Sequence, residues 1–163
     1  MTAGMATEFT VRAILDRDFL VELLRLRWSG GALLVRGKII APVDVEALAA
    51  YDGERLAGIA TWRLEGKVLY LVTLNNITDQ RGVGIALLDA ILELGRVKGA
   101  ALLRAIVTND NLNALGFYQR RKFRIIAVYP GAVDTIRSIN PNIPTIGAHR
   151  IPLRDEIELE RDL

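Results

Sequence analysis

The 163-residue sequence contains no cysteine and only one histidine, His149. Without thiols the chain can form neither a disulfide nor a Cys-ligated zinc site, and it cannot use a cysteine nucleophile. A single histidine also excludes a His-rich metal site and disfavours a Ser-His-Asp triad. The composition therefore predicts a protein without a metal site and without a covalent intermediate on cysteine.

The sequence also lacks an excess of charge of either sign and any long apolar run. Its 21 Lys and Arg residues oppose 19 Asp and Glu residues, which gives a formal net charge of +2. A charge this balanced does not favour nucleic acid or a membrane surface as a partner. No apolar run approaches the roughly 18 residues of a membrane span, and residues 1–8 lack the basic-then-apolar pattern of a signal peptide. We therefore expect a cytoplasmic protein.

The sequence does contain enough hydrophobic residues to form one hydrophobic core. Hydrophobic residues make up 51% of the chain and charged residues 25%, which is a globular composition. The length is that of one domain, and neither an internal repeat nor a linker rich in Pro, Gly or Ser divides it. We therefore expect residues 1–163 to form a single domain.

Residues 9–74 predict a strand, a helix and then an antiparallel meander. Asp16 suits the N-cap of a helix that runs to about Trp28 and ends at residues 29–31. Residues 32–42 are ambiguous, because two short extended segments around a tight turn would also fit them. The predicted strands cover residues 9–14, 46–51, 55–64 and 67–74, with tight turns at Gly37-Lys38, Asp52-Gly53 and Glu65-Gly66.

Residues 75–163 predict one parallel crossover and two further strands. Apolar residues recur at spacings of three and four from Gly84 to Lys98, which predicts an amphipathic helix. Because this helix lies between two apolar strands, the three elements make a parallel crossover. The elements expected after the helix are a strand over 100–108, a short helix over 111–121, a strand over 123–129, an irregular loop over 130–150 and a last strand over 156–160.

The last predicted strand alternates glutamates with apolar residues. Glu156, Glu158 and Glu160 lie on one side and Ile157 and Leu159 on the other, so the charged side is expected to face water. Together the elements predict an α+β fold. Its centre is a mixed sheet, an antiparallel meander plus one parallel crossover, with flanking helices.

A glycine-containing loop opens the predicted crossover helix. Its sequence is Gly82-Val83-Gly84-Ile85-Ala86, preceded by Arg81. Backbone N–H groups at a helix N-terminus have no partner inside the helix and, with the helix dipole, suit a diphosphate. Glycine permits close approach of the backbone, and Arg81 adds a charged donor. By itself, however, Gly-x-Gly is also a common turn without function.

Two common phosphate-binding motifs match this loop poorly. A nucleotide P-loop needs Gly-Lys-Ser/Thr at the helix start, where this chain has Ile85-Ala86-Leu87. A dinucleotide-binding loop needs Gly-x-Gly-x-x-Gly directly after its strand. Here Leu87 occupies the third glycine position, and seven residues separate Leu74 from Gly82.

Two motifs together resemble the GNAT (Gcn5-related) N-acetyltransferase superfamily. The pattern Arg-x-x-Gly-x-Ala at Arg81, Gly84 and Ala86 is similar to its pyrophosphate loop. The segment Asn111 to Phe123 is similar to its Asn-x-x-Ala-x-x-Phe-Tyr-x-x-x-Gly-Phe signature, with Lys122 where the family has glycine. The resemblance covers nearly the whole chain and extends to an uncharacterised bacterial branch of the family.

The resemblance implies acetyl-CoA as cosubstrate and a set of residues that bind it. Its pantetheine arm would lie between the strands that end at Leu74 and Thr108, and would pair with backbone near Leu74 and Asn75. A backbone N–H near these residues would polarise the thioester carbonyl. Asn111 would contact the cofactor, cap its helix, or do both. The pyrophosphate would bind Arg81 and the amides of Gly82, Val83, Gly84, Ile85 and Ala86.

The resemblance also implies a general acid at Tyr118. A phenol with a pKa of about 10 stays protonated at neutral pH and can donate to a thiolate leaving group. The alternative is that Tyr118 is simply a buried aromatic residue of its helix. The general base is open, because the strand before the loop contains no acid. The candidates are Glu65, Asp79, Glu156 through a water, and His149.

The function predicted on this basis is direct transfer of an acetyl group from acetyl-CoA to a primary amine. The acceptor is expected to be a small molecule or a peptide, cationic if the glutamates of the last strand line its pocket. The alternative is a non-catalytic CoA-binding sensor or assembly module that retains the loop without a base. An acyl group larger than acetyl and a homodimer also remain open.

Overall fold

The computed structural model describes residues 8–28 and 33–163. In the part of the chain described, a seven-stranded sheet has the order β1-β4-β5-β6-β7-β9-β8, and β6 and β7 are its one parallel pair. This arrangement confirms the predicted α+β fold. Its strands are β1 (Thr10–Ala13), β4 (Glu46–Asp52), β5 (Arg55–Glu65), β6 (Val68–Asn76), β7 (Leu102–Thr108), β8 (Arg124–Tyr129) and β9 (Glu156–Asp162).

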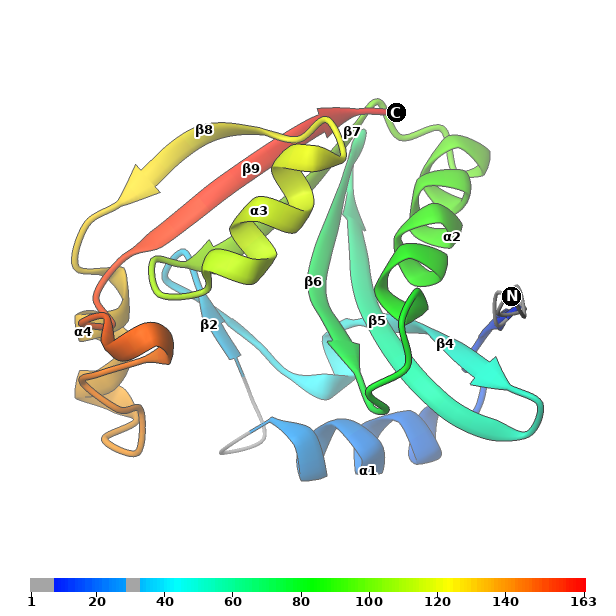
Figure 1. Cartoon of the computed structure of the whole chain (residues 1–163), viewed down its shortest axis with the longest axis horizontal. Helices are drawn as coiled ribbons and strands as arrows, with labels where there is room; N and C mark the ends of the chain where they lie inside the picture. The colour runs from blue at the N-terminus through cyan, green and yellow to red at the C-terminus, as the bar shows by residue number, and fades with distance from the viewer. Residues whose placement is uncertain (1–7, 29–32) are drawn as a thin grey trace, which may run out of the picture.

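Helices cover both faces of this sheet (Figure 1). On one face α2 (Val83–Val97) buries Leu87, Leu88 and Ile91 against β6 and β7, and α3 (Leu112–Arg120) joins the same core. On the other face α1 (Arg17–Arg27) buries Leu20 and Leu24 in a second core. Apolar residues at helical spacing account for both layers. None of the helices described is long and apolar enough to cross a membrane.

The start of α1 agrees with the sequence, and the first tight turn lies at Arg36-Gly37, one residue before the predicted Gly37-Lys38. The Asp16 side chain accepts a hydrogen bond from the Phe19 N–H at 3.0 Å, as an N-cap does. Arg36 and Gly37 both have positive φ and join β2 (Leu33–Val35) to β3 (Lys38–Ile40) in a separate two-stranded ribbon. The helix end predicted at residues 29–31 lies outside the residues described.

The irregular loop predicted over residues 130–150 is wrong in part, because it contains a helix. This helix, α4 (Ala132–Ile139), begins after Gly131, which has a φ of 73°. The prolines that suggested a loop flank the helix instead of interrupting it, and Val133 and Ile136 give it an apolar face. Proline excludes a helix only where it lies inside one.

Strands β6 and β7 separate part-way along their length. They pair only from Val68 to Leu71 on β6, with Leu102 to Ala105 on β7. At that point the pairing of β6 with β5 shifts, and Val72 is the extra residue of a bulge. A bulge bends the strand that carries it. Beyond it the two strands diverge, as Figure 1 shows, and leave a V-shaped opening in the sheet.

Lys122 lies in the left-handed region, with a φ of 67°. It stands where the related motif has glycine, which adopts this conformation without steric cost. We expect Lys122→Gly to stabilise the fold by about 1 kcal/mol, since the left-handed conformation costs an L-residue roughly that much. A thermal melt checks this. Lys122→Ala is the control, because it removes the same side chain but keeps Cβ; an equal gain in both variants would contradict a backbone origin.

Candidate functional site

The N-terminus of α2 presents free backbone donors. Gly82 caps the helix with a φ of 94°, and the first amide bonded within the helix is that of Ala86, which donates to the Gly82 carbonyl at 2.9 Å. The N–H groups of Val83, Gly84 and Ile85 therefore have no partner inside the helix. Three free amides and the positive end of a 15-residue helix make a site for an anion.

This helix N-terminus lies beside the V-shaped opening. A Cβ on Gly84 would be 3.6 Å from Asn76 Oδ1, at the end of β6, and 3.7 Å from Phe117 Cζ on α3. The start of α2 can lie this close to β5 because residue 58 is glycine: a Cβ on Gly58 would collide with the Val83 side chain. The structure thus brings together the glycine loop, the end of β6 and the Asn111–Phe123 motif.

The connector between β6 and α2 is tied to the neighbouring hairpin. The N–H groups of Ile77 and Thr78 both donate to the Ala57 carbonyl, at 2.8 and 3.1 Å. The Gln80 amide donates to Asp52 Oδ2 at 2.6 Å. These bonds hold the loop, while the Arg81 side chain is exposed and free to meet a ligand.

Helix α3 begins at Asn111 and carries Tyr118 into the core. The Asn111 side chain accepts a hydrogen bond from the Ala114 N–H at 3.1 Å, so it caps the helix as predicted. Tyr118 is buried against Phe117 and Phe123, with ring centroids 5.3 and 5.0 Å away. Burial raises the pKa of the Tyr118 phenol above its ordinary value, so the hydroxyl keeps its proton at neutral pH.

The prediction that the acidic side of the last strand faces water is wrong. Glu156, Glu158 and Glu160 are only 3%, 2% and 8% exposed. They are buried because the β2–β3 ribbon and other basic residues cover this face. Arg36 Nη1 donates to Glu158 at 3.0 Å, and Arg104 Nε donates to Glu160 at 2.8 Å.

Glu156 differs from the other two glutamates because no cation pairs with its side chain among the residues described. Its Oε2 accepts one hydrogen bond, from the Arg36 backbone N–H at 3.3 Å. Burial raises the pKa of the Glu156 carboxyl above its ordinary value, and this single bond and the Arg36 charge oppose the shift only in part. A carboxylate in this state readily accepts a proton or a cation.

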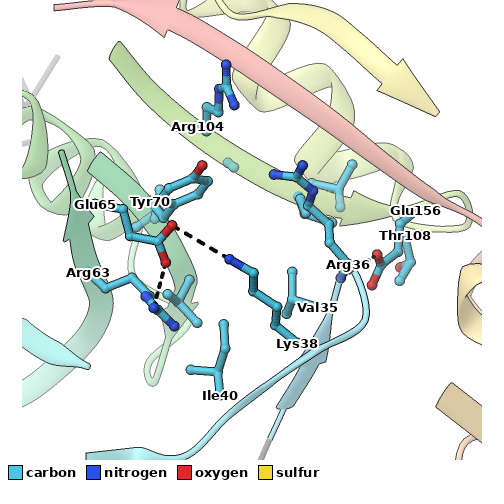
Figure 2. Close-up of a pocket in the computed structure, with 15 residues that line it drawn as sticks. Val35, Arg36, Lys38, Ile40, Arg63, Glu65, Tyr70, Arg104, Thr108 and Glu156 are labelled. Atoms are coloured by element: carbon cyan, nitrogen blue, oxygen red, sulfur yellow. Dashed lines mark hydrogen bonds and ion pairs between the residues drawn. The ribbon is translucent and has the colours of Figure 1, made fainter. Parts of the chain in front are cut away.

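Two cavities meet at Glu156 and Thr108, which line both of them. The first, the β2–β3 cavity, has a volume of about 310 Å³. Figure 2 shows Lys38 of the ribbon pointing across it toward Glu65, whereas the Arg36 side chain is paired with Glu158 of β9. The second, the α1–α4 groove, has a volume of about 1120 Å³ and runs between helices α1 and α4. Glu156 therefore lies where a ligand in either cavity would approach the V-shaped opening.

The other candidate bases are placed less favourably. Glu65 is already paired with Arg63 at 2.5 Å and with Lys38 at 3.9 Å. Asp79 and His149 are exposed and line neither cavity. Within residues 8–28 and 33–163, no three acidic or histidine side chains cluster as metal ligands. The sequence could not single out Glu156, since only the covering ribbon distinguishes it from the other glutamates of β9.

Residues 28–123 match the model of the acetyltransferase (GNAT) family. The chain belongs to this family. The match spans the meander, the glycine loop and α3, so it includes the two strands of the V-shaped opening and the N-terminus of α2, but not β9. Family membership supports acetyl-CoA-dependent acyl transfer as the general activity.

Relatives of this GNAT chain extend the likeness over most of its length. It is 28% identical to the uncharacterised protein YxbD of Bacillus subtilis strain 168 over 148 residues, which cover 90% of this chain and 93% of YxbD. It is 29% identical to the uncharacterised YdhI of the same strain over 142 residues, 86% of this chain and 89% of YdhI. Neither relative identifies an acceptor.

Solved structures share the fold. A Bacillus subtilis acetyltransferase in complex with CoA superposes with a TM-score of 0.72 at 21% identity, covering 96% of this chain and 99% of that one. The IAA acetyltransferase of Bacillus cereus superposes with a TM-score of 0.76 at 18% identity, covering 96% and 100%. At such low identity these structures establish the fold, and they leave the acceptor of this chain open.

Proposed function

We propose that this GNAT protein transfers the acetyl group of acetyl-CoA directly to a primary amine. The observation that carries the proposal is the V-shaped opening between β6 and β7 beside the three free amides of α2. The amides suit the pyrophosphate of CoA, and the opening suits its extended pantetheine arm. The pyrophosphate would then contact Arg81 and Gly82–Ala86, with Asn111 nearby at the start of α3.

The strand pairing supports a choice of the backbone groups of β6 that would meet the pantetheine. The Ile77 N–H donates to the Ala57 carbonyl at 2.8 Å. Hydrogen-bonded pairs alternate along antiparallel strands, so Asn75 directs its backbone groups toward β5, whereas Leu74 and Asn76 direct theirs into the opening. Leu74 and Asn76 would thus pair with the pantetheine as an added strand does, and Asn75 would contribute its side chain.

We assign the two proton transfers of the reaction to Glu156, which lines both cavities, and to Tyr118, which stands at the general-acid position of the family motif. The acceptor ammonium gives a proton to Glu156, directly or through a water, and its nitrogen becomes nucleophilic. The nitrogen attacks the thioester carbon, whose oxygen is stabilised by a backbone N–H of β6. The C–S bond then breaks, and the thiolate takes the proton of Tyr118. The amide nitrogen loses its second proton, which returns Tyr118 to its neutral form, and Glu156 gives its proton to solvent. No enzyme-bound acetyl group is formed.

The proposal is tested by two measurements on the same protein. Acetyl-CoA should raise the melting temperature, and CoA should be released when primary amines are added. Stabilisation by acetyl-CoA without turnover of any amine would favour a non-catalytic CoA-binding module. No stabilisation at millimolar acetyl-CoA would contradict both.

Replacing Tyr118 with Phe should lower kcat about tenfold to a hundredfold and leave acetyl-CoA binding intact. The loss is at the low end for general acids, since a thiolate with a pKa of about 8.5 leaves without much help. Steady-state kinetics and the acetyl-CoA thermal shift provide the two readouts. Unchanged turnover would assign Tyr118 to the core alone, where Phe117 and Phe123 already hold it.

A further inference from the structure

The α1–α4 groove exposes an unusual amount of apolar surface. Leu26 on α1, Ile39 on β3 and Ile139 on α4 all line it, and they are 79%, 68% and 67% exposed. Single exposed apolar residues are common on proteins, but several around one groove indicate a binding surface. The deeper lining is apolar as well, with Trp28 and Val133 buried at its walls.

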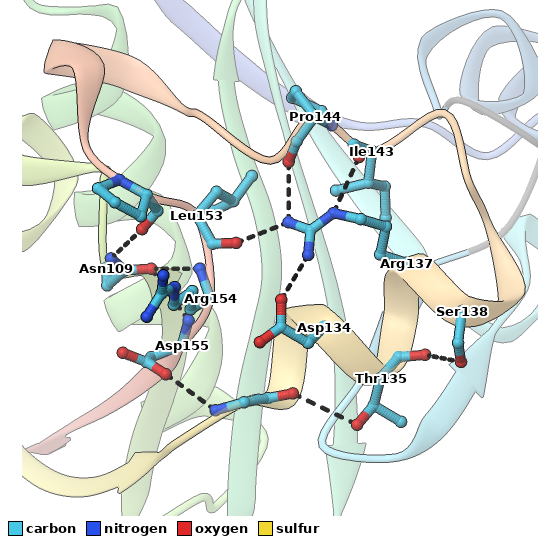
Figure 3. A network of polar contacts seen from close by, with 12 residues as sticks. Asn109, Asp134, Thr135, Arg137, Ser138, Ile143, Pro144, Leu153, Arg154 and Asp155 are labelled. Atoms are coloured by element: carbon cyan, nitrogen blue, oxygen red, sulfur yellow. Dashed lines mark hydrogen bonds and ion pairs between the residues drawn. The ribbon is translucent and has the colours of Figure 1, made fainter.

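The α4 wall of the groove is held in place by its own contacts. Arg137 donates to the carbonyls of Ile143, Pro144 and Leu153 at 3.1, 2.8 and 2.6 Å, as Figure 3 shows, and pairs with Asp134. These bonds fix the helix against the segment that leads into β9. The groove is therefore a formed feature of the fold.

Most polar groups of the groove lie at one end, and Arg27 of α1 and Asn140 at the end of α4 are the polar residues elsewhere in its described lining. Thr73 and Asn75 of β6 and Thr108 of β7 lie there, beside the V-shaped opening, together with Glu156. Among the described residues that line the groove, Glu156 is the only acid. One buried carboxylate complements one ammonium group, whereas the α1 wall carries the cation Arg27 and no acid, so it would repel a second ammonium group.

We propose that the acceptor is a small primary amine with an extended apolar body, whose ammonium group meets Glu156 while its body lies along the α1–α4 groove. This inference rests on the proposed function and names its substrate class. Polyamines and aminoglycosides do not fit, because each would place further charges against Leu26 and Ile139. A peptide fits less well, since away from the V-shaped opening only Arg27 and Asn140 of the described lining offer polar partners to its backbone.

The test is a series of linear primary amines from butylamine to octylamine, with spermidine and a leucyl dipeptide as polar comparisons. Burial of each methylene is worth a factor of about four in affinity. We expect kcat/KM to rise about two- to fourfold for each added methylene, and spermidine and the dipeptide to be poorer acceptors than octylamine. CoA release measures the rate.

Two matched pairs of variants locate the effect. Leu26→Ser and Ile139→Ser alter exposed residues of the groove, whereas Leu15→Ser and Ile146→Ser alter residues that are 85% and 53% exposed and do not line it. The groove variants should flatten the dependence of kcat/KM on chain length, and the control variants should keep it. The acetyl-CoA thermal shift should be the same in all four.

The outcomes separate this inference from the proposed function. Acetyl-CoA binding with no amine turned over would overturn both. Turnover with a flat chain-length dependence, or with spermidine or the dipeptide preferred, would overturn the apolar acceptor alone. A dimer that Leu26→Ser converts to a monomer, with the chain-length dependence unchanged, would show that a second copy covers the groove and would also overturn it.

Discussion

Replacing Gly84 with Val is expected to abolish the stabilisation of this protein by acetyl-CoA. At a hundredfold excess over Kd, a ligand stabilises the folded state by about 2.7 kcal/mol. For a chain of this length that corresponds to a rise of roughly 5–10 °C in melting temperature. In the variant we expect no measurable rise in the same thermal melt.

The loss follows from the position of Gly84 between α2, Asn76 and Phe117. A Cβ there would make ordinary contacts at 3.6 and 3.7 Å, so the unliganded fold has room for it. The larger Val side chain would instead fill the space through which the diphosphate reaches the free amides. The variant's own melting temperature without ligand is measured as well, so that loss of the diphosphate site is distinguished from loss of the fold.

Asp89→Val is the matched control for Gly84→Val. It places the same β-branched side chain on an exposed position of the same helix, where it faces solvent. It should keep the full acetyl-CoA shift. If Gly84→Val also kept the full shift, the diphosphate would have to bind elsewhere, and the proposed role of the α2 N-terminus would be wrong.

The elements around the opening could be predicted because their signals are local. Asp52-Gly53 and Glu65-Gly66 fix two hairpins in chain order, and the apolar spacing of Val83–Val97 fixes a helix on the sheet. A strand, a helix and a strand then leave little choice of topology. The glycine loop at the start of that helix gives its chemistry directly, since free amides exist at every helix N-terminus.

The bulge at Val72 could not be predicted, because no residue type specifies it. From the sequence, this strand is predicted to end at Leu74, which makes the connector to the next helix a residue or two longer than is usual in the family that the sequence resembles. The structure extends β6 to Asn76, with one residue taken up by the bulge. The separation of β6 from β7 arises from that tertiary feature.

Burial of the β9 glutamates was equally hidden from the sequence. An alternating strand normally has one face in water, and Glu156, Glu158 and Glu160 follow that pattern. Their burial depends on Arg36, which lies 122 residues from Glu158 in the chain. Only the folded ribbon brings the two together, so the sequence could list Glu156 as one of four candidate bases but could not favour it over the others.

Replacing Glu156 with Gln should lower kcat/KM for an amine acceptor about a hundredfold or more, as loss of a general base does. The amide keeps the shape of the side chain but cannot take a proton. In the wild type kcat/KM should fall as the pH drops through the raised pKa of Glu156, and the variant should lose this dependence. Glu160→Gln is the matched control on the same strand face, and its kcat/KM should change little.

The melting temperature of Glu156→Gln gives an independent readout: the substitution that lowers activity should raise stability. Burial raises the folded-state pKa of Glu156 above its unfolded value. The charged groups that face Glu156 are Arg36 and Glu158, and the Tyr129 hydroxyl donates a hydrogen bond to Glu158. The contribution of Glu156 favours folding at low pH and is lost as the pH rises through that raised pKa. At neutral pH, Glu156→Gln should therefore raise the melting temperature, and the gain should vanish in acid.

The control Glu160→Gln should lower the melting temperature, because this substitution leaves Arg104 without its charged partner. A loss of stability in Glu156→Gln would assign Glu156 to the ion-pair network and not to the acceptor site.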